Sequence, residues 1–298
     1  MAALLALAVI AGYLAGHHRA QPAAKEQVLL AREASVALEY PSSWRPAVSA
    51  PVIPGLSIAH PLVLAPGGDA ARAGLISGQL PAGEPGPLPQ TFVALMPELP
   101  RTEVVSILDV RAYRYPRVHV PAYAPSLELY VIPTAGRPTA IACYASQGAS
   151  SYLRQCEQIV ATLTPVGHLE YDVKPRAGYS SRLGPVIDEL DRERLIIRRQ
   201  MGAVRAPRAV AGLARTLADR FATTAAAIRA FRPPAAAAAA QAALVASLER
   251  ADESYRALAG AASGPAAGVA AAQAQVGSAE GGVDGALATF ALLGYKHS

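Results

Sequence analysis

The pattern of apolar and polar positions divides the chain into a strand-rich part and a helical part. Val36, Leu38 and Tyr40 alternate with small or polar neighbours, which is the period of two expected of a half-buried strand. A helix is predicted over residues 150–163, where apolar positions recur three and four apart. Further strand-like runs, separated by loops rich in proline and glycine, cover residues 56–64, 74–80, 103–108, 110–115, 127–132 and 138–144. Many short strands closed by a helix predict an α+β unit, an antiparallel sheet with helical cover.

From residue 181 onward the apolar positions recur three and four apart, as in helices that bury one stripe. Prolines are predicted to open four helices, because the first helical turn leaves its N–H groups unbonded and loses nothing to proline. Short turns make neighbouring helices antiparallel, so an all-α up-down four-helix bundle is predicted. Gly294 is placed to cap the last helix, and the glycine-rich residues 277–285 predict a bend or mobile segment within it. The four prolines are Pro185, Pro207, Pro234 and Pro265.

The chain of 298 residues is long enough for two domains. We expect a membrane anchor or signal segment at residues 1–20 and an α+β domain at 21–166. A linker is expected at residues 167–180, where proline and glycine interrupt the pattern, and the four-helix bundle at 181–298.

Residues 2–16 are apolar throughout and are followed by His17, His18 and Arg19. A run of about 15 apolar residues is shorter than the roughly 20 that a spanning helix needs. We expect an uncleaved anchor or export signal, with a buried or frayed N-terminal helix as the alternative. Arg19 and Lys25 would by charge bias alone hold the following domain inside the cell, so an extracytoplasmic location rests on other features.

Composition narrows the class of partner. The chain has 27 basic and 22 acidic residues, a net charge of +5, and 52% hydrophobic residues, many of them alanine. A basic chain could bind nucleic acid or a lipid surface. Because the basic residues lie among acidic ones along predicted helices, we expect a mixed surface and no nucleic-acid partner.

The two cysteines of the chain are Cys143 and Cys156. The first falls on a predicted strand and the second in the helix that follows, so a short loop can bring their Cα atoms within bonding range. We predict a disulfide in an oxidising compartment, with two unrelated buried thiols as the alternative. A catalytic or metal role is not expected, because the spacing is not that of a CxxC motif and no histidine cluster accompanies it.

The opening Val36 to Tyr40, Pro41 and Trp44, together with the closing residues 156–163, resembles the PsbP-like fold. This family includes extrinsic photosystem subunits and many bacterial extracytoplasmic lipoproteins. The similarity covers residues 34–166 and implies that Tyr40 and Trp44 are core residues. It implies a mostly non-enzymatic role and carries no functional residue to this chain.

The helical part resembles alanine- and arginine-rich regions of actinobacterial envelope proteins of unknown function. Those regions end in a Leu-Gly-Tyr like Leu293, Gly294 and Tyr295. The resemblance implies a location in the cell envelope and no particular activity.

No catalytic, metal-binding or phosphate-binding motif stands out, and we expect no cofactor. Among the six histidines, only the adjacent His17 and His18 are close in sequence, and neighbours on a helix do not readily share a metal. The acidic residues at 188–193 interleave with arginines, and Asp188 lies four before Arg192. This pattern predicts a solvated ion-pair face.

These features together predict a membrane-tethered extracytoplasmic protein of the cell envelope without enzymatic activity. The α+β domain would be a binding or docking module, and the bundle a spacer or interaction surface. The expected partners are the membrane, through the N-terminal segment, and an envelope protein. Alternatives are a carrier of an apolar or cell-wall-associated ligand and an unrecognised enzyme. A docking module predicts an exposed apolar patch, a carrier a large apolar pocket, and an enzyme a cleft with clustered titratable groups.

Overall fold

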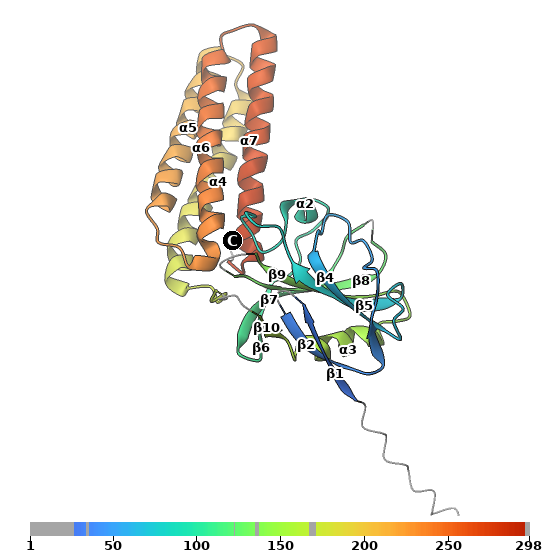
Figure 1. Cartoon of the computed structure of the whole chain (residues 1–298). Helices are drawn as coiled ribbons and strands as arrows, with labels where there is room; N and C mark the ends of the chain where they lie inside the picture. The colour runs from blue at the N-terminus through green and yellow to red at the C-terminus, as the bar shows by residue number, and fades with distance from the viewer. Residues whose placement is uncertain (1–26, 34–35, 122, 135–136, 167–170, 296–298) are drawn as a thin grey trace, which may run out of the picture.

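The computed structural model of the chain describes residues 27–33, 36–121, 123–134, 137–166 and 171–295. It shows antiparallel sheets with helical cover, followed by a bundle of long helices (Figure 1). The predicted fold class, α+β followed by an all-α bundle, is therefore confirmed. The predicted anchor at residues 1–20 lies outside the described residues. None of the helices in the described ranges combines the length and apolarity needed to cross a membrane.

Two sheets make up the α+β part, and every pair of neighbouring strands in them is antiparallel. The small sheet has the order β1-β2-β10, with β1 at Val28–Glu33, β2 at Val36–Pro41 and β10 at Thr164–Pro165. The large sheet has the order β3-β4-β5-β9-β8-β7-β6. Its strands are β3 Trp44–Pro46, β4 Ala59–Pro66, β5 Ala73–Gln79, β6 Glu103–Ile107, β7 Val110–Val118, β8 Ser126–Ile132 and β9 Thr139–Ala145.

The large sheet separates two cores. On one face, helix α3 (Ser151–Val160) and the small sheet enclose Trp44 and Cys143. The Trp44 side chain is fully buried, and its indole N–H donates to Oε1 of Gln155 on α3 at 3.0 Å. The other face is covered by the short helix α2 (Gln90–Val93), by loops and by one end of the bundle (Figure 1). Strand β9 is buried along its whole length because both of its faces are covered.

The bundle consists of four long helices packed side by side (Figure 1). They are α4 at Ala177–Ala203, α5 at Pro207–Arg229, α6 at Ala238–Ala261 and α7 at Ala266–Leu292, with a short 3₁₀ helix, η1, at Ala235–Ala237. Between α5 and α6 the rings of Phe221 and Tyr255 stack with centroids 5.6 Å apart. Many other interior positions are alanine, whose small side chain lets the helix axes approach closely.

Helix α4 differs from its prediction, because Pro185 lies inside it rather than at its start. The helix begins eight residues earlier at Ala177, within the stretch expected to be a linker. Tyr179 explains the difference: it is buried, stacks against Phe290 and donates its hydroxyl to Gln241 at 2.8 Å. This packing stabilises the first turns enough to offset the roughly 3 kcal/mol that an interior proline costs a helix. Proline opens α5 as predicted and directly precedes η1 and α7.

Helix α7 runs without interruption through residues 277–285, so the predicted bend is wrong. Its buried face explains this: Val283 is fully buried, and Glu280 is buried and bonded to neighbouring helices. The prediction for Gly294 is confirmed. It adopts a positive φ of 79°, and Tyr295 N–H donates to the Phe290 carbonyl at 3.0 Å, which closes the helix in the manner of a Schellman cap.

The C-terminal end of α7 joins the bundle to the large sheet. Tyr115 on β7 donates its hydroxyl to the Leu292 carbonyl at 2.8 Å, and Thr102 donates to the Ala291 carbonyl at 3.1 Å. Gln90 on α2 donates its side-chain amide to Thr289 at 3.1 Å. One apolar cluster runs from the sheet into the bundle at this point. The two parts therefore share a continuous core.

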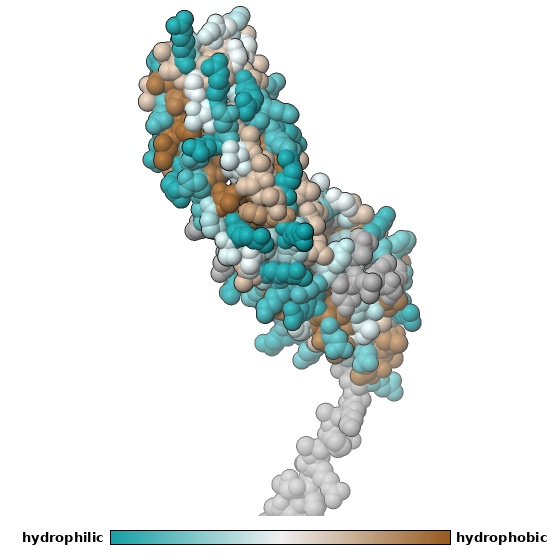
Figure 2. Space-filling view, turned by 90° about the vertical axis from the view of Figure 1, so that its left-hand side faces the viewer, coloured by the Kyte–Doolittle hydropathy of each residue, from teal (hydrophilic) through white to brown (hydrophobic). Residues whose placement is uncertain are grey.

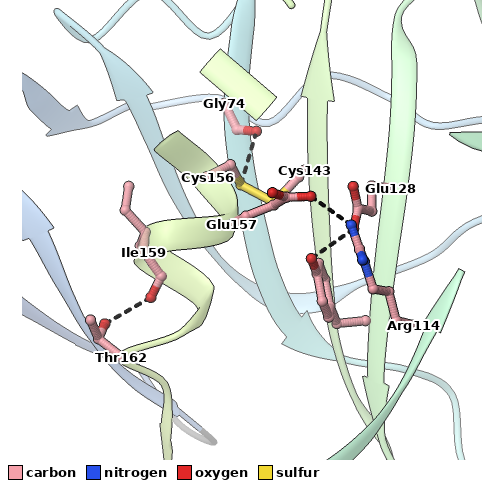
Figure 3. The surroundings of a disulfide bond; sticks show 9 residues. Gly74, Arg114, Glu128, Cys143, Cys156, Glu157, Ile159 and Thr162 are labelled. Atoms are coloured by element: carbon pink, nitrogen blue, oxygen red, sulfur yellow. Dashed lines mark hydrogen bonds and ion pairs between the residues drawn. A yellow bond between two sulfur atoms is a disulfide. The ribbon is translucent and has the colours of Figure 1, made fainter. Parts of the chain in front are cut away.

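The predicted disulfide is confirmed: Cys143 on β9 bonds Cys156 on α3, with their Cα atoms 5.9 Å apart (Figure 3). Both residues are buried between the sheet and the helix. The bond fixes α3 to the middle of the large sheet.

Replacing both cysteines, Cys143→Ala with Cys156→Ala, is expected to lower the free energy of unfolding by about 3 kcal/mol, because the unfolded chain gains the entropy of an open loop of about 14 residues. Urea unfolding followed by Trp44 fluorescence measures the loss. Wild-type protein unfolded under reducing conditions is the control and should lose a similar amount. An unchanged midpoint in both experiments would contradict the prediction.

Candidate functional site

Strand β1 is an edge strand with an unusually apolar surface. Within the described residues it pairs with β2 alone, so one of its edges is unpaired. Its residues Val28, Leu29 and Leu30 are 64%, 41% and 67% exposed. Figure 2 shows hydrophobic surface at this lower end of the α+β part. Soluble proteins usually protect such edges with charges or proline, so an exposed apolar edge indicates an interaction surface.

The register of β1 on β2 determines which backbone groups face the free edge. On the far side of β2, Glu39 N–H donates to Oγ1 of Thr162 at 2.9 Å, so the Glu39 amide points away from Leu30, its partner on β1. At the other end of the pair, Ser42 N–H donates to the Gln27 carbonyl at 2.8 Å. Hydrogen-bonded and non-bonded pairs alternate in an antiparallel ladder. The N–H and C=O groups that point outward therefore belong to Val28, Leu30 and Arg32.

A groove of about 420 Å³ opens between β2 and α3, with Val28 of β1 among its lining residues. Its apolar lining includes Tyr40 and Ile159, which are otherwise buried, and its polar lining includes Gln158. An edge strand next to such a groove suits an extended peptide, whose backbone pairs with the strand while a side chain enters the groove. The strand and the groove together are called the edge groove below. The groove is lined by Val28, Glu39, Tyr40, Pro41, Ser43, Gln155, Gln158, Ile159 and Thr162.

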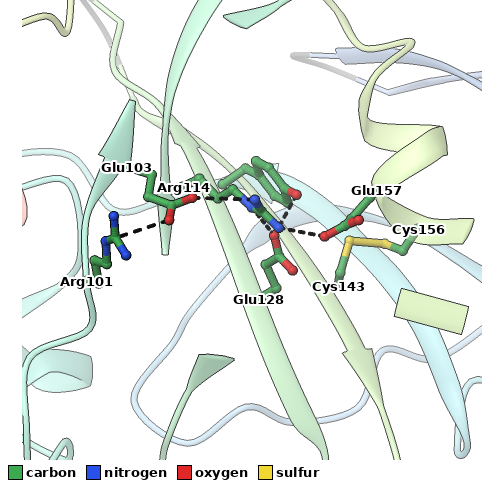
Figure 4. Close-up of polar contacts among 8 residues, drawn as sticks. Arg101, Glu103, Arg114, Glu128, Cys143, Cys156 and Glu157 are labelled. Atoms are coloured by element: carbon green, nitrogen blue, oxygen red, sulfur yellow. Dashed lines mark hydrogen bonds and ion pairs between the residues drawn. A yellow bond between two sulfur atoms is a disulfide. The ribbon is translucent and has the colours of Figure 1, made fainter. Parts of the chain in front are cut away.

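A charged cluster holds α3, one wall of the edge groove, against the sheet (Figures 3 and 4). Arg114 on β7 contacts Glu157 on α3 at 2.6 Å and Glu103 on β6 at 3.4 Å. It also bonds Glu128 on β8, whose carboxylate accepts the Tyr130 hydroxyl at 2.7 Å. One guanidinium thus links three strands to α3, directly beside the disulfide. The sequence gives no local signal for this cluster, because its members are 11 to 43 positions from Arg114.

The cluster perturbs one of its own carboxyl groups. Burial raises the pKa of Glu157 above its ordinary value, and the neighbouring Glu128 raises it further, whereas Arg114 opposes both. Clustered carboxyl groups with shifted pKa values occur at active sites, but structural ion-pair networks produce the same shifts. Here every carboxylate contacts Arg114, so the arrangement is that of a network that positions α3.

The acidic and basic residues of α4 form two kinds of contact. Arg192 is exposed and pairs with Glu189, as the predicted solvated face requires. Arg194 is buried, and for this residue the prediction is wrong: it contacts Asp284 on α7 at 3.0 Å. Its position on the inner side of α4, toward α7, places the guanidinium in the seam between the helices.

Glu280 on α7 lies in the same seam and is also buried. It accepts the Tyr255 hydroxyl at 2.6 Å and contacts Arg198 at 2.8 Å. These contacts connect α4, α6 and α7 through polar side chains, so this network serves the bundle.

A second cavity, about 300 Å³ in volume, lies where the bundle meets the α+β part. It is lined by the proline-rich loop at 81–87, by Tyr113 and Tyr171, and by alanines at the start of α6. Two of the histidines, His60 and His119, lie in the described residues. Across the described ranges no three His, Cys, Asp or Glu side chains come together as a metal site would require.

Comparison with known proteins gives little beyond this geometry. No protein-family model and no curated protein matches the chain. A solution structure of cyanobacterial PsbP (CyanoP) from Synechocystis sp. PCC 6803 is weakly similar, with 11% identity over 48% of this chain and 95% of that one and a TM-score of 0.32. A crystal structure from Bacteroides thetaiotaomicron shares 9% identity over 75% of this chain and 73% of that one, with a TM-score of 0.28.

The pKa shifts predict opposite pH dependences for two carboxyl groups, Glu157 inside the charged cluster and Asp172 outside it. Because folding raises the pKa of Glu157 above 4.5, its contribution to stability is present below that pH and is lost as pH rises through the folded-state pKa. The difference in unfolding free energy between wild type and Glu157→Gln should therefore fall as pH rises above about 4.5. Urea unfolding at successive pH values measures it.

Asp172 supplies the matched control. The Lys174 N–H and then Arg111 lower its pKa below 3.8, so its contribution is present above that pH and is lost on acidification. The wild type minus Asp172→Asn difference should rise with pH. If both differences in unfolding free energy changed with pH in the same direction, the assigned directions of the two pKa shifts would be contradicted.

Proposed function

We propose that this chain is a membrane-tethered extracytoplasmic docking protein of the cell envelope without enzymatic activity. In this proposal the partner is an envelope protein that adds an extended segment to β1 at the edge groove. The observation that carries it is the unpaired edge of β1, with exposed Val28, Leu29 and Leu30 beside a groove. Main-chain pairing supplies affinity, and the groove supplies selectivity for the side chain that enters it.

The compartment rests on features outside the edge groove. The apolar residues 2–16 would hold the chain in the membrane, and a buried disulfide suits an oxidising compartment. The resemblances to PsbP-like extracytoplasmic proteins and to actinobacterial envelope proteins point the same way. About ten residues separate the apolar segment from β1, and an extended chain of that length spans at most about 35 Å. The edge groove would thus stay close to the membrane surface, where a membrane-bound partner can reach it.

A carrier of an apolar or cell-wall-associated ligand is the second candidate. The cavity between the bundle and the α+β part favours it, because Tyr113, Tyr171 and several prolines line that space. Its volume of about 300 Å³ matches the lower limit of small-molecule sites. The edge groove is the stronger candidate because it combines exposed apolar side chains with unpaired backbone groups.

The test of docking changes one backbone donor at the free edge. Leu30→Pro removes the outward N–H while keeping an apolar side chain, and edge strands tolerate proline at such positions. The matched variant Leu30→Val keeps the N–H. A photo-crosslinking residue at position 28, in the groove, reports on the partner in intact cells. We expect one discrete adduct in wild type and Leu30→Val, and about tenfold less in Leu30→Pro, because one lost hydrogen bond costs about 1.5 kcal/mol.

Two controls make the result interpretable. The same crosslinker at Leu108, which is also 64% exposed but lies after β6, should give no such adduct. Thermal unfolding confirms that Leu30→Pro stays folded. An equally strong adduct in Leu30→Pro, or the same adduct from position 108, would rule out strand addition at β1.

A further inference from the structure

Arginines gather on the half of the bundle that lies away from the sheet. No aspartate or glutamate occurs at residues 194–218, which form the end of α4, the turn and the start of α5. None occurs at residues 254–279, at the end of α6 and the start of α7, which pack beside them. Within residues 194–218 five arginines are exposed: Arg198, Arg199, Arg205, Arg208 and Arg215.

Most of these arginines have no carboxylate partner. Arg198 contacts Glu280 at 2.8 Å. Arg205 donates to the Gly202 carbonyl at 3.3 Å. Within the described part of the chain, Arg199, Arg208 and Arg215 form no salt bridge. Four of the five guanidinium groups therefore keep their charge unneutralised at the surface, so the mixed surface predicted from the whole composition does not extend to this end.

The arginines lie on two flanks of the bundle. Arg198 shares the side of α4 that turns toward α7, as its contact with Glu280 shows. Arg208 and Arg215 are seven positions apart on α5, and Asp219 continues the same stripe. Because Asp219 contacts Arg256 on α6 at 2.9 Å, that stripe faces the α6 side. Arg205 lies in the turn that connects the two flanks.

A groove gives one flank a path for a ligand. It has a volume of about 520 Å³ and is lined by Arg194, Arg198 and Arg199 with Asp191 and Leu195. Figure 2 shows hydrophilic side chains over much of this upper half of the molecule, mixed with pale and hydrophobic surface. The exposed neighbours Gly202, Ala203, Ala206 and Ala209 are small. The small neighbours leave the guanidinium groups open to a bulky partner.

We propose that this distal arginine surface binds a flexible anionic polymer that carries phosphate groups. Guanidinium groups bond phosphate oxygens in pairs, and neutralising several phosphates releases their counterions. A flexible polymer can follow both flanks and the turn between them, whereas a flat bilayer meets one flank at a time. The surface lies at the opposite end of the molecule from β1 (Figure 1), so it would face away from a membrane that holds the N-terminus. The proposal is independent of docking at the edge groove.

The test uses the full chain in nonionic detergent micelles and fluorescently labelled inorganic polyphosphate. Fluorescence anisotropy at several salt concentrations measures the dissociation constant. The triple variant Arg199→Gln, Arg205→Gln, Arg208→Gln is expected to bind at least about tenfold more weakly at low salt, with the salt slope reduced by about 2. The matched control neutralises Arg45, Arg72 and Arg154, three exposed arginines of the α+β part, and should bind like wild type.

Each other outcome overturns the proposal. If both triple variants weakened polyphosphate binding equally, binding would depend on the net charge of the protein and not on the distal arginine surface. If the wild type showed no measurable binding to polyphosphate at low salt, the proposed binding site would be refuted. Leu195 and Ile196 on α4 are 52% and 48% exposed, and both would suit insertion into a bilayer. Phosphatidylglycerol vesicles would identify a membrane as the target if they displaced labelled polyphosphate at a lower phosphate concentration than unlabelled polyphosphate does. Phosphatidylcholine vesicles should then displace none. Circular dichroism verifies that each variant is folded.

Discussion

The shape of the whole molecule depends on the contacts between the C-terminal end of α7 and the α+β part. A helix leaves its last carbonyl groups without partners, and here Tyr115 and Thr102 of the α+β part donate to those of Leu292 and Ala291. Gly294 turns the chain so that Tyr295 packs edge-on against both Tyr179 and Phe290 at the same place. Because the apolar core continues through this junction, the bundle extends from the sheet in one direction. The edge groove and the distal arginine surface are thereby held at opposite ends (Figure 1).

The edge groove results from what the core does and does not cover. Val36, Leu38 and Tyr40 of β2 are buried, and α3 is held over the large sheet by the disulfide and by Arg114. With α3 in place, β2 pairs with the short β10 on one side and β1 on the other. Nothing among the described residues pairs with the outer edge of β1. The exposed apolar residues of β1 contribute little to the core, so the stability of the fold does not explain them. A binding role is the better explanation.

Periodicity predicted most of the fold, because amphipathic elements reveal which face they bury. The strands around Val36 and Cys143 and the four long helices are of this kind. It missed β1, since the run from Val28 to Glu33 lacks alternation and its pairing depends on β2. It misplaced the start of α4, because the burial of Tyr179 against α7 is a tertiary effect.

The candidate sites were harder to predict than the fold. The disulfide could be predicted, since it joins two consecutive elements. The Arg114 cluster could not, because it joins residues from β6, β7, β8 and α3. The distal arginines can be recognised in the sequence, because they lie in a stretch without acidic residues. The net charge of the whole chain hides this local excess of positive charge.

Hydrogen exchange of β1 is the most direct test of the central claim, that the free edge of β1 is a docking site. Mass spectrometry would compare the peptide covering residues 27–33 in purified protein and in native envelope membranes. The account predicts that the outward amides of Leu30 and Arg32 exchange rapidly in the purified protein and markedly more slowly in the membranes. The edge strand β6, Glu103–Ile107, should exchange alike in both samples. Equally rapid exchange of β1 in both samples would contradict the account.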